Sequence, residues 1–292
     1  METASVILAL IFATLRLATP LIFATTGGLM SERSGIVNIA LEGFMLFGAF
    51  AGAVVGQYFA SAWMGWGAAL LAGLLIGALY ALFVIELKAD QIVTGMAFNL
   101  LAMGVIPFLT KILYNSTGTT PALLVEDRFT FEPLLMGFLL VALVAFWLYK
   151  SRSGLWLLFA GEHPEALLAS GVSVRKVRWS AVCASGVFAA WGGASLSLFL
   201  SSAYSPMMTS GRGYMALAAL IFGKWRPFPA LGACLLFAFA DAVQIRLQGV
   251  RFGDTEIPVQ FVQILPYLVT IIALAGFIGK SRAPKALGRE GF

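Results

Sequence analysis

The sequence predicts an all-α fold, a bundle of about nine transmembrane helices, and three observations carry that prediction. Apolar residues make up 60% of the 292 residues and charged residues only 11%. The mean hydropathy is +0.91, whereas a soluble globular domain carries roughly 25% charged residues and is far less apolar. The apolar residues also gather in runs of about 20, the length that an α-helix needs to cross a bilayer. A soluble enzyme is therefore excluded, and a polytopic membrane protein is expected.

Nine apolar runs follow one another along the chain, separated by short polar stretches. They lie near residues 5–30, 36–60, 63–86, 91–113, 133–149, 179–200, 213–223, 227–247 and 259–279. Most are long enough to cross the membrane at about 1.5 Å per residue, whereas 213–223 is short and is open to interpretation as a re-entrant half-helix. We expect eight to ten crossings in a single membrane domain that covers residues 1–292. Glycines that repeat every four residues at 48–56 and 73–77 predict close packing of helices.

Basic residues predict the orientation, because cytoplasmic loops are enriched in Lys and Arg. The segment 150–178 holds five of them, and placing it inside the cell puts thirteen basic residues in cytoplasmic loops against five outside. This arrangement predicts an N-terminus outside and a C-terminus in the cytoplasm. Since the 19 basic residues are spread over the loops rather than gathered on one element, the net charge of +5 indicates no nucleic-acid partner.

The residue types needed for hydrolysis inside the membrane are missing from the sequence. His163 is the single histidine, so an H-E-x-x-H zinc motif cannot form, and no paired carboxylates share a helical face within an apolar run. Residues 279–281 read Gly-Lys-Ser like the end of a phosphate-binding loop, but Leu274 stands where the leading glycine is needed. Cys183 and Cys234 lie inside apolar runs and predict neither a disulfide framework nor a metal site. We therefore expect no enzyme activity, metal or cofactor in this chain.

Polar side chains inside the apolar runs are candidates for a solute pathway, because such groups are costly in lipid and face the bundle interior or a wet cavity. Asn38 and Glu42, for example, are four residues apart and share a helix face. For Glu42, the alternatives to substrate contact are an interhelical hydrogen bond and a position near the cytoplasmic boundary. Arg16, halfway along the first run, is expected to pair with one of the acids Glu42 and Asp241 rather than to bind solute, and snorkelling to the membrane surface is the alternative. The candidates for the pathway are Asn38, Glu42, Thr94, Asn99, Asp241 and Gln244.

The segment 150–178 is too polar to cross the membrane and too long to be a mere connector. Pro164 suits the first turn of a helix, Glu165 complements the helix dipole, and Gly171 can supply a left-handed stop. A short helix of about two turns is therefore predicted, with Leu167 and Leu168 facing water. An exposed apolar knob flanked by basic residues is typical of a docking site for a partner protein. A helix that lies on the membrane surface is the alternative.

Three stretches resemble permeases of ABC importers. Residues 161–177, G-E-H-P-E-A-L-L-A-S-G-V-S-V-R-K-V, are similar to the cytoplasmic coupling loop of the branched-chain amino acid, ribose and nucleoside group, whose usual form is G-x-N-P-x-A-A-x-x-x-G-I. His163 and Leu167 depart from that form. Residues 30–45, M-S-E-R-S-G-I-V-N-I-A-L-E-G-F-M, resemble the segment after the first helix in nucleoside-type permeases. Residues 216–229 resemble the late cytoplasmic turn of the same family.

The resemblance implies a permease subunit of an ATP-driven importer in the bacterial cytoplasmic membrane, which translocates a small neutral metabolite, most closely a nucleoside. Besides membrane lipid, it implies three protein partners: an ATP-binding cassette ATPase that holds ATP and Mg, a second similar permease, and an extracytoplasmic solute-binding lipoprotein or periplasmic protein. Simple sugars, riboflavin and branched-chain amino acids are the alternative solutes. A stand-alone secondary transporter or channel is the alternative mechanism, which needs internal repeats or a coupling-ion site. The coupling role carries over to Gly161, Glu162, His163, Pro164, Glu165, Ala166 and Gly171.

Overall fold

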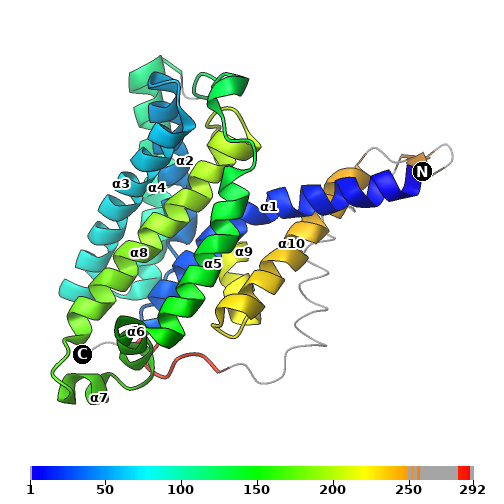
Figure 1. Ribbon diagram of the computed structural model, residues 1–292. Helices are drawn as coiled ribbons and strands as arrows, with labels where there is room; N and C mark the ends of the chain where they lie inside the picture. Colours follow the sequence, from blue (N-terminus) through cyan, green and yellow to red (C-terminus); the bar gives the residue numbers. More distant parts are fainter. Residues whose placement is uncertain (1, 117, 249–250, 253–254, 257–281, 290–292) are drawn as a thin grey trace.

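The computed structural model describes residues 2–116, 118–248, 251–252, 255–256 and 282–289 (Figure 1). In this part of the chain the fold is helical apart from two short antiparallel strands, so the predicted all-α bundle is confirmed. The elements are α1 (Glu2–Arg33), α2 (Leu41–Tyr58), α3 (Ala62–Ala81), the π-helical turn η1 (Leu82–Glu86), α4 (Gln91–Tyr114), the 3₁₀ turn η2 (Val125–Asp127), α5 (Glu132–Lys150), α6 (Arg152–Glu162), α7 (Pro164–Ala169), α8 (Val174–Ser195), the π-helical turn η3 (Leu196–Leu200), α9 (Arg212–Phe222), α10 (Pro227–Leu247), β1 (Arg251–Phe252) and β2 (Thr255–Glu256).

Seven helices are long and apolar enough to cross a membrane within the described ranges. They correspond to seven of the nine expected runs, which confirms a multi-pass membrane protein. The run 213–223 forms α9, whose 11 residues cover only about half of a hydrocarbon core roughly 30 Å thick. Its length therefore fits the half-helix interpretation. The ninth run, 259–279, lies outside the described residues.

Helices α2, α3 and α8 pack closely with one another along their lengths (Figure 1). Small residues make this approach possible. A methyl group added at Gly48 of α2 would overlap the backbone of Ala190 in α8, and one added at Gly73 of α3 would lie 2.5 Å from the carbonyl oxygen of Gly186. The structure thus confirms the close helix packing that the glycine repeats predicted.

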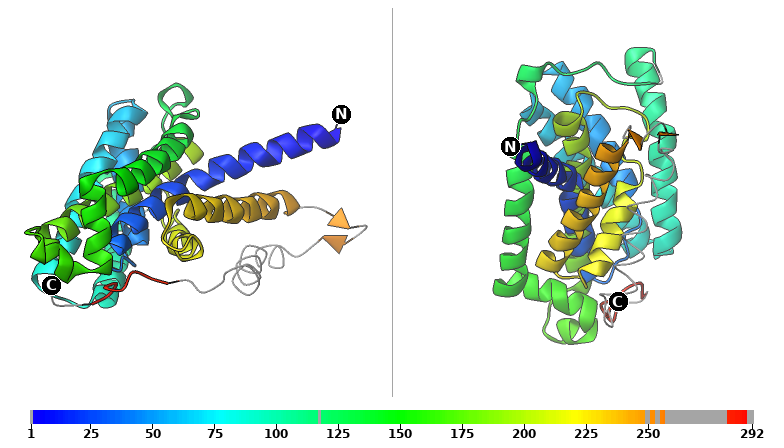
Figure 2. Two further views of the ribbon diagram at one scale, coloured as in Figure 1. Left: turned by 60° about the horizontal axis from the view of Figure 1, so that its bottom comes forward. Right: turned by 90° about the vertical axis from the view of Figure 1, so that its right-hand side faces the viewer.

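Helices α1 and α10 lie side by side and extend away from the rest of the bundle, with α9 packed against both (Figure 2). The C-terminal part of α1 is buried between α8 on one side and α9 and α10 on the other. At the end where α1 finishes, α5 leads into α6 and α7, and the described part of the C-terminal tail lies beside them (Figure 1). This end carries the segment with the predicted coupling residues.

Candidate functional site

The predicted short helix in the coupling segment is present. Helix α7 begins at Pro164, ends at Ala169 and has Glu165 in its first turn. Gly171 follows with a φ of +81°, and its amide donates to the carbonyl oxygen of Leu168 at 2.9 Å. A glycine adopts this left-handed conformation without the steric cost that a Cβ brings. The sequence therefore predicted both the start of this helix and the glycine that follows its end.

One prediction about α7 is wrong. Leu167 does not face water: its side chain is only 2% exposed and packs with Ala160 of α6 and Val174 of α8 in a small apolar cluster. Leu168 is 49% exposed, as expected. Successive residues of an α-helix point about 100° apart, so Leu167 can face α6 and α8 while Leu168 points away from them. Leu167 thus holds α7 in place and Leu168 remains on the surface.

The outer face of α7 presents His163, Glu165 and Ala166, all of them exposed. With Glu162 and Pro164 they line one wall of a hollow of about 290 Å³, and Lys285, Ala286 and Arg289 of the tail line the other. The structure thus gathers the predicted residues from 162 to 166 on one accessible surface at the end of the bundle. Gly161 and Gly171 flank that surface, Gly161 buried under it and Gly171 exposed beyond α7.

The segment that precedes α7 is anchored to α1 and to the tail. The carbonyl oxygen of Gly161 accepts a hydrogen bond from the Ala286 amide at 2.8 Å. Glu162 forms an ion pair with Arg33, the last residue of α1, at 3.5 Å. A methyl group on Gly161 would overlap the carbonyl oxygen of Arg33, so only glycine allows α6 to end this close to α1. These contacts join the segment before α7 to the end of α1 and to the tail.

The segment that follows α7 is anchored to α3. Arg175, in the first turn of α8, reaches Glu86 at the end of η1 with two nitrogens, at 2.5 and 2.6 Å. The indole nitrogen of Trp179 donates to the same carboxylate at 2.7 Å. A guanidinium with two contacts to one carboxylate fixes orientation as well as distance. Helices α3 and α8 are thereby joined directly behind the coupling segment.

The loop between α1 and α2, residues 34–40, belongs to the motif that resembles nucleoside-type permeases, and it is mostly buried. Irregular backbone is tolerated at membrane depth only where protein groups satisfy it. The Val37 amide donates to Gln91 Oε1 at 2.7 Å, and the Val37 carbonyl accepts from the Tyr80 hydroxyl at 2.8 Å. The Ser34 carbonyl accepts from Arg178 Nε at 3.2 Å. Side chains from α3, α4 and α8 thus hold this loop.

Two of the predicted pathway residues also support the loop. Asn38 is fully buried, donates to Ser185 of α8 at 2.9 Å and accepts from the Ala40 amide at 3.1 Å. Asn99 of α4 accepts from the Gly43 amide at 2.8 Å and donates to the Ile39 carbonyl at 3.0 Å. Its amide nitrogen also donates to the Tyr214 hydroxyl on α9, at 2.9 Å. Asn38 thus joins the loop to α8, and the expectation that it shares a helix face with Glu42 is wrong because α2 begins only at Leu41. Asn99 joins α4 to the loop, to α2 and to α9. Contact of either asparagine with solute stays a prediction.

Glu42, at the start of α2, caps the half-helix α9. Its carboxylate accepts from the Thr209 hydroxyl at 2.5 Å and from the amides of Gly211 and Gly213 at 2.8 and 2.6 Å. The side chain is 3% exposed. A carboxylate at a helix N-terminus satisfies orphan amides and complements the helix dipole. The structure thus shows the interhelical role that was weighed for Glu42, and substrate contact again stays a prediction.

Thr94, Asp241 and Gln244 are the remaining polar candidates for the pathway. Thr94 is buried in α4, while Asp241 and Gln244 are half-buried on α10. Arg16 does not make the expected pair: neither ion pair among the described residues includes it, and its guanidinium instead contacts Phe199, donating to the carbonyl oxygen at 3.4 Å and lying 5.1 Å from the ring centroid. The first run therefore carries its charge beside an aromatic ring rather than a carboxylate.

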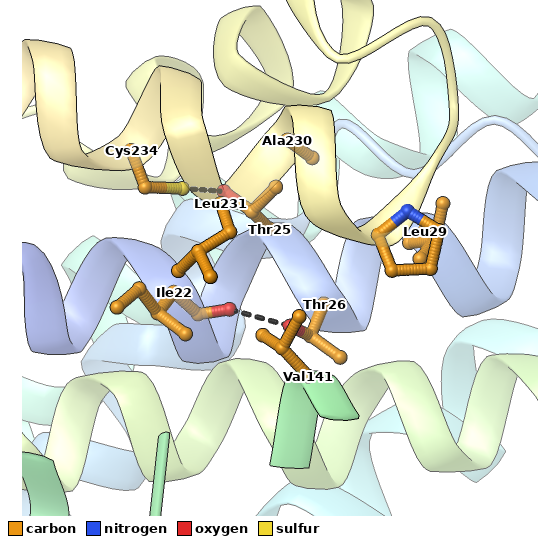
Figure 3. A pocket seen from close by; sticks show the side chains of 9 residues that line it. Ile22, Thr25, Thr26, Leu29, Val141, Ala230, Leu231 and Cys234 are labelled. Carbon is orange, nitrogen blue, oxygen red and sulfur yellow. Dashed lines mark hydrogen bonds between the residues drawn. The ribbon is translucent and has the colours of Figure 1, made fainter. Parts of the chain in front are cut away.

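A small hollow lies within the bundle between α1, α5 and α10 (Figure 3). Its volume is about 10 Å³, enough for about one water molecule and far below the several hundred Å³ of small-ligand sites. The hydroxyl groups beside it are engaged: Thr26 donates to the Ile22 carbonyl at 2.7 Å, and Thr25 accepts from the Cys234 thiol at 3.1 Å (Figure 3). A metabolite does not fit in this hollow.

Sequence reasoning missed the residues that position the others. Gln91, Tyr80 and Arg178 hold the loop 34–40, and Glu32 accepts from the Trp225 indole at 2.5 Å to join the end of α1 to the end of α9. Each is polar and lies in or beside an apolar run, which was a signal that could have identified them. Their partners are distant in the sequence, so the pairs themselves could not be read from one chain.

A bundle of membrane-crossing helices with a short anchored helix projecting at one end is the architecture of a transport permease. The comparison with known families identifies the permease family to which the chain belongs. Residues 10–274 match the family described as the permease component of branched-chain amino acid transport systems, and the chain belongs to this family.

Several proteins of known name are similar to the chain over nearly its full length. The guanosine ABC transporter permease protein NupQ of Bacillus subtilis (strain 168) is 37% identical, over 99% of this chain and 98% of NupQ. The nucleoside ABC transporter permease protein NupC of Lactococcus lactis subsp. cremoris is 38% identical, over 93% and 92%. A second guanosine permease protein of B. subtilis, NupP, is 27% identical, over 92% of this chain and 81% of NupP.

A solved structure supports the fold. An ABC transporter of the metal-chelate type, in an inward-facing conformation, aligns with a TM-score of 0.50, covering 92% of this chain and 85% of the other. The sequence identity is 18%, so the likeness concerns the fold alone.

Proposed function

We propose that this chain is a permease subunit of an ATP-driven importer of nucleosides in the bacterial cytoplasmic membrane. The observation that carries the proposal is the 37% identity to a guanosine permease over 99% of the chain. The similar nucleoside permease of Lactococcus lactis points to the same solute class. Simple sugars, riboflavin and branched-chain amino acids are the alternatives that an experiment must separate.

The proposed ATPase partner docks on the outer face of α7. His163, Glu165 and Ala166 are exposed there, next to a hollow large enough to receive a side chain of a partner. Anchors on both sides of α7 support a lever mechanism: Glu162 connects it to α1 through Arg33, and Arg175 connects it to the end of α3 through Glu86. A small rigid-body displacement of a docked helix can then rearrange the packed membrane helices. ATP and Mg are held by the ATPase and not by this chain.

The proposed second permease completes the solute pathway, which runs between the two subunits. The hollow inside this chain is too small for a metabolite. Helix α4 exposes a row of apolar side chains that suits contact with a second helical subunit or with lipid. The two guanosine permease proteins of B. subtilis, both similar to this chain, are a precedent for two different permeases in one cell.

A neutral solute fits the charges at the buried network. The positive end of the α9 dipole is an anion site in principle, but Glu42 already occupies it. Tyr214, 46% exposed, offers an aromatic ring and a hydroxyl next to Asn99. A nucleoside has a base that can stack on such a ring and hydroxyls that can bind to such groups. We therefore assign the pathway to the face that carries Tyr214, with Asp241 and Gln244 on the neighbouring helix.

The proposed orientation places the N-terminus outside and α7 with the tail in the cytoplasm. The tail contacts Gly161 and Gly35, so the two segments that the basic residues assigned to the inside lie together. An extracytoplasmic binding protein delivers solute at the opposite end.

Uptake by proteoliposomes tests the proposal. The chain is reconstituted with its cognate ATPase, second permease and binding protein, and uptake of labelled guanosine, adenosine and cytidine is followed with ATP on the ATPase side. We expect uptake that requires ATP and is inhibited by unlabelled nucleosides but not by ribose, riboflavin or leucine. Inhibition by one of those three and not by nucleosides would reassign the solute. Uptake without any ATPase would contradict the importer mechanism.

A further inference from the structure

The C-terminal tail is fixed to the coupling segment by its backbone. The Ala286 amide donates to the Gly161 carbonyl at 2.8 Å, and the Gly288 amide donates to the Gly35 carbonyl at 3.1 Å. Ala286 is 3% exposed, and Leu287 packs against the apolar cluster that includes Leu157 and Trp225. Residues 282–289, which we call the strap, therefore hold a defined position beside α7 and the loop 34–40.

The strap brings basic side chains to the surface that α7 presents. Lys285 and Arg289 are exposed and line the hollow opposite His163 and Glu165. The two ion pairs among the described residues, Arg33 with Glu162 and Arg175 with Glu86, include neither of them. Of the two acidic residues that line the hollow, Glu162 is paired with Arg33. Glu165 is then the one remaining acidic group, and it faces two basic groups, Lys285 and Arg289. The wall formed by the strap is consequently positive, although α7 itself carries no basic residue.

We propose that the docking surface for the ATPase is composite, consisting of α7 and the strap, and that acidic side chains of the ATPase bind Lys285 and Arg289. This inference rests on the proposed function, because it names further residues of the same docking site. Complementary charge at the rim of an interface raises the rate of association and fixes the register of the partners. The strap thus adds an electrostatic contact with the ATPase to the contact that the exposed face of α7 makes.

The experiment measures binding of the purified cognate ATPase to the permease pair in nanodiscs. The double variant Lys285→Glu with Arg289→Glu is compared with Arg282→Glu, an exposed basic residue of the same strap that does not line the hollow. Two surface charge pairs are together worth about a tenfold change in affinity. We expect the double variant to bind the ATPase about tenfold more weakly at 0.15 M salt or below, and Arg282→Glu to stay within about twofold of the wild type. High salt should weaken binding of the wild type and strengthen binding of the double variant, because salt screens the attraction in the first and the repulsion in the second.

Unaltered affinity of the double variant would overturn the proposal. All three positions are exposed, so an unchanged melting temperature of each variant checks that folding is intact. Glu165→Lys and His163→Trp are measured in the same assay to separate this inference from the proposed function. If they weaken binding while the double variant does not, the strap is not part of the docking surface and the ATPase site on α7 stands. If none of the variants weakens binding, docking at this end of the bundle is wrong altogether.

Discussion

The outer face of α7 and the buried network around Glu42 are both rich in polar groups, but they use them in opposite ways. On α7, His163 and Glu165 are exposed, and no side-chain hydrogen bond of either is found among the described residues. In the network, Glu42 and Asn99 each make three hydrogen bonds to other segments of this chain. Exposed polar groups without a partner in the chain are available to bind another molecule. Polar groups that are satisfied within the chain hold its helices together.

This difference also decides how a substitution should act. Removing a satisfied buried group orphans its partners and lowers the free energy of unfolding. Replacing an exposed group leaves that free energy nearly unchanged and alters only binding. Measurements of stability beside measurements of transport therefore separate the two regions.

The largest loss of stability is expected for Glu42→Ala. The change leaves Thr209 and the amides of Gly211 and Gly213 without their acceptor in a buried site, which should cost about 3 kcal/mol of unfolding free energy. Denaturant titration in detergent micelles measures it, with Glu126→Ala, an exposed glutamate, as the matched control. Equal stability of the two variants would contradict the capping role of Glu42.

Asn99→Ala should follow, with a loss of roughly 2 kcal/mol of unfolding free energy. Each interhelical hydrogen bond in a membrane protein contributes about 0.6 kcal/mol on average and about 1.7 kcal/mol at most. Three of them connect Asn99 to Gly43, Ile39 and Tyr214. Thr94→Val, on the same helix, keeps the shape of a buried side chain and serves as the control. A variant that kept its stability but changed its preference among nucleosides would instead indicate substrate contact by Asn99.

The two leucines of α7 allow the same comparison between a buried and an exposed side chain within one helix. Leu167→Ala removes packing against Ala160 and Val174, which should cost about 2 kcal/mol, at the lower end for buried leucines because the cluster is small. Leu168→Ala, at an exposed position, should change the free energy of unfolding by less than about 0.5 kcal/mol. Hydrogen exchange over residues 160–177 locates the loss. The same exchange rates in both variants would show that Leu167 does not hold α7.

The smallest effect is expected at the ion pair between Glu86 and Arg175. Arg175 is largely exposed, so Glu86→Gln should lower the melting temperature slightly, and the difference from the wild type should shrink in 1 M salt because exposed charges are screened. Exchange of the two charges, Glu86→Arg with Arg175→Glu, should restore part of the loss. A difference that grows with salt would rule out an electrostatic contribution.

The sequence was informative where local chemistry decides the outcome. Pro164 and Gly171 marked both ends of α7, and apolar length identified the seven described crossings and the short α9. It was uninformative where partners are distant along the chain. Leu167 was placed in water because only its immediate neighbours were considered, and Arg16 was paired with an acid because Phe199, 183 positions away, was unknown. The loop 34–40 could be matched to a family, but not the side chains that hold it.

The most direct test of the account compares transport with stability in variants of the exposed face of α7. His163→Trp and Glu165→Lys are reconstituted with the cognate ATPase, second permease and binding protein, and nucleoside uptake and ATP hydrolysis are measured in the same vesicles. We predict an unchanged melting temperature, uptake reduced at least about tenfold and ATP hydrolysis that no longer responds to solute. Wild-type uptake by both variants would contradict the claim that α7 is the lever through which an external ATPase drives this bundle.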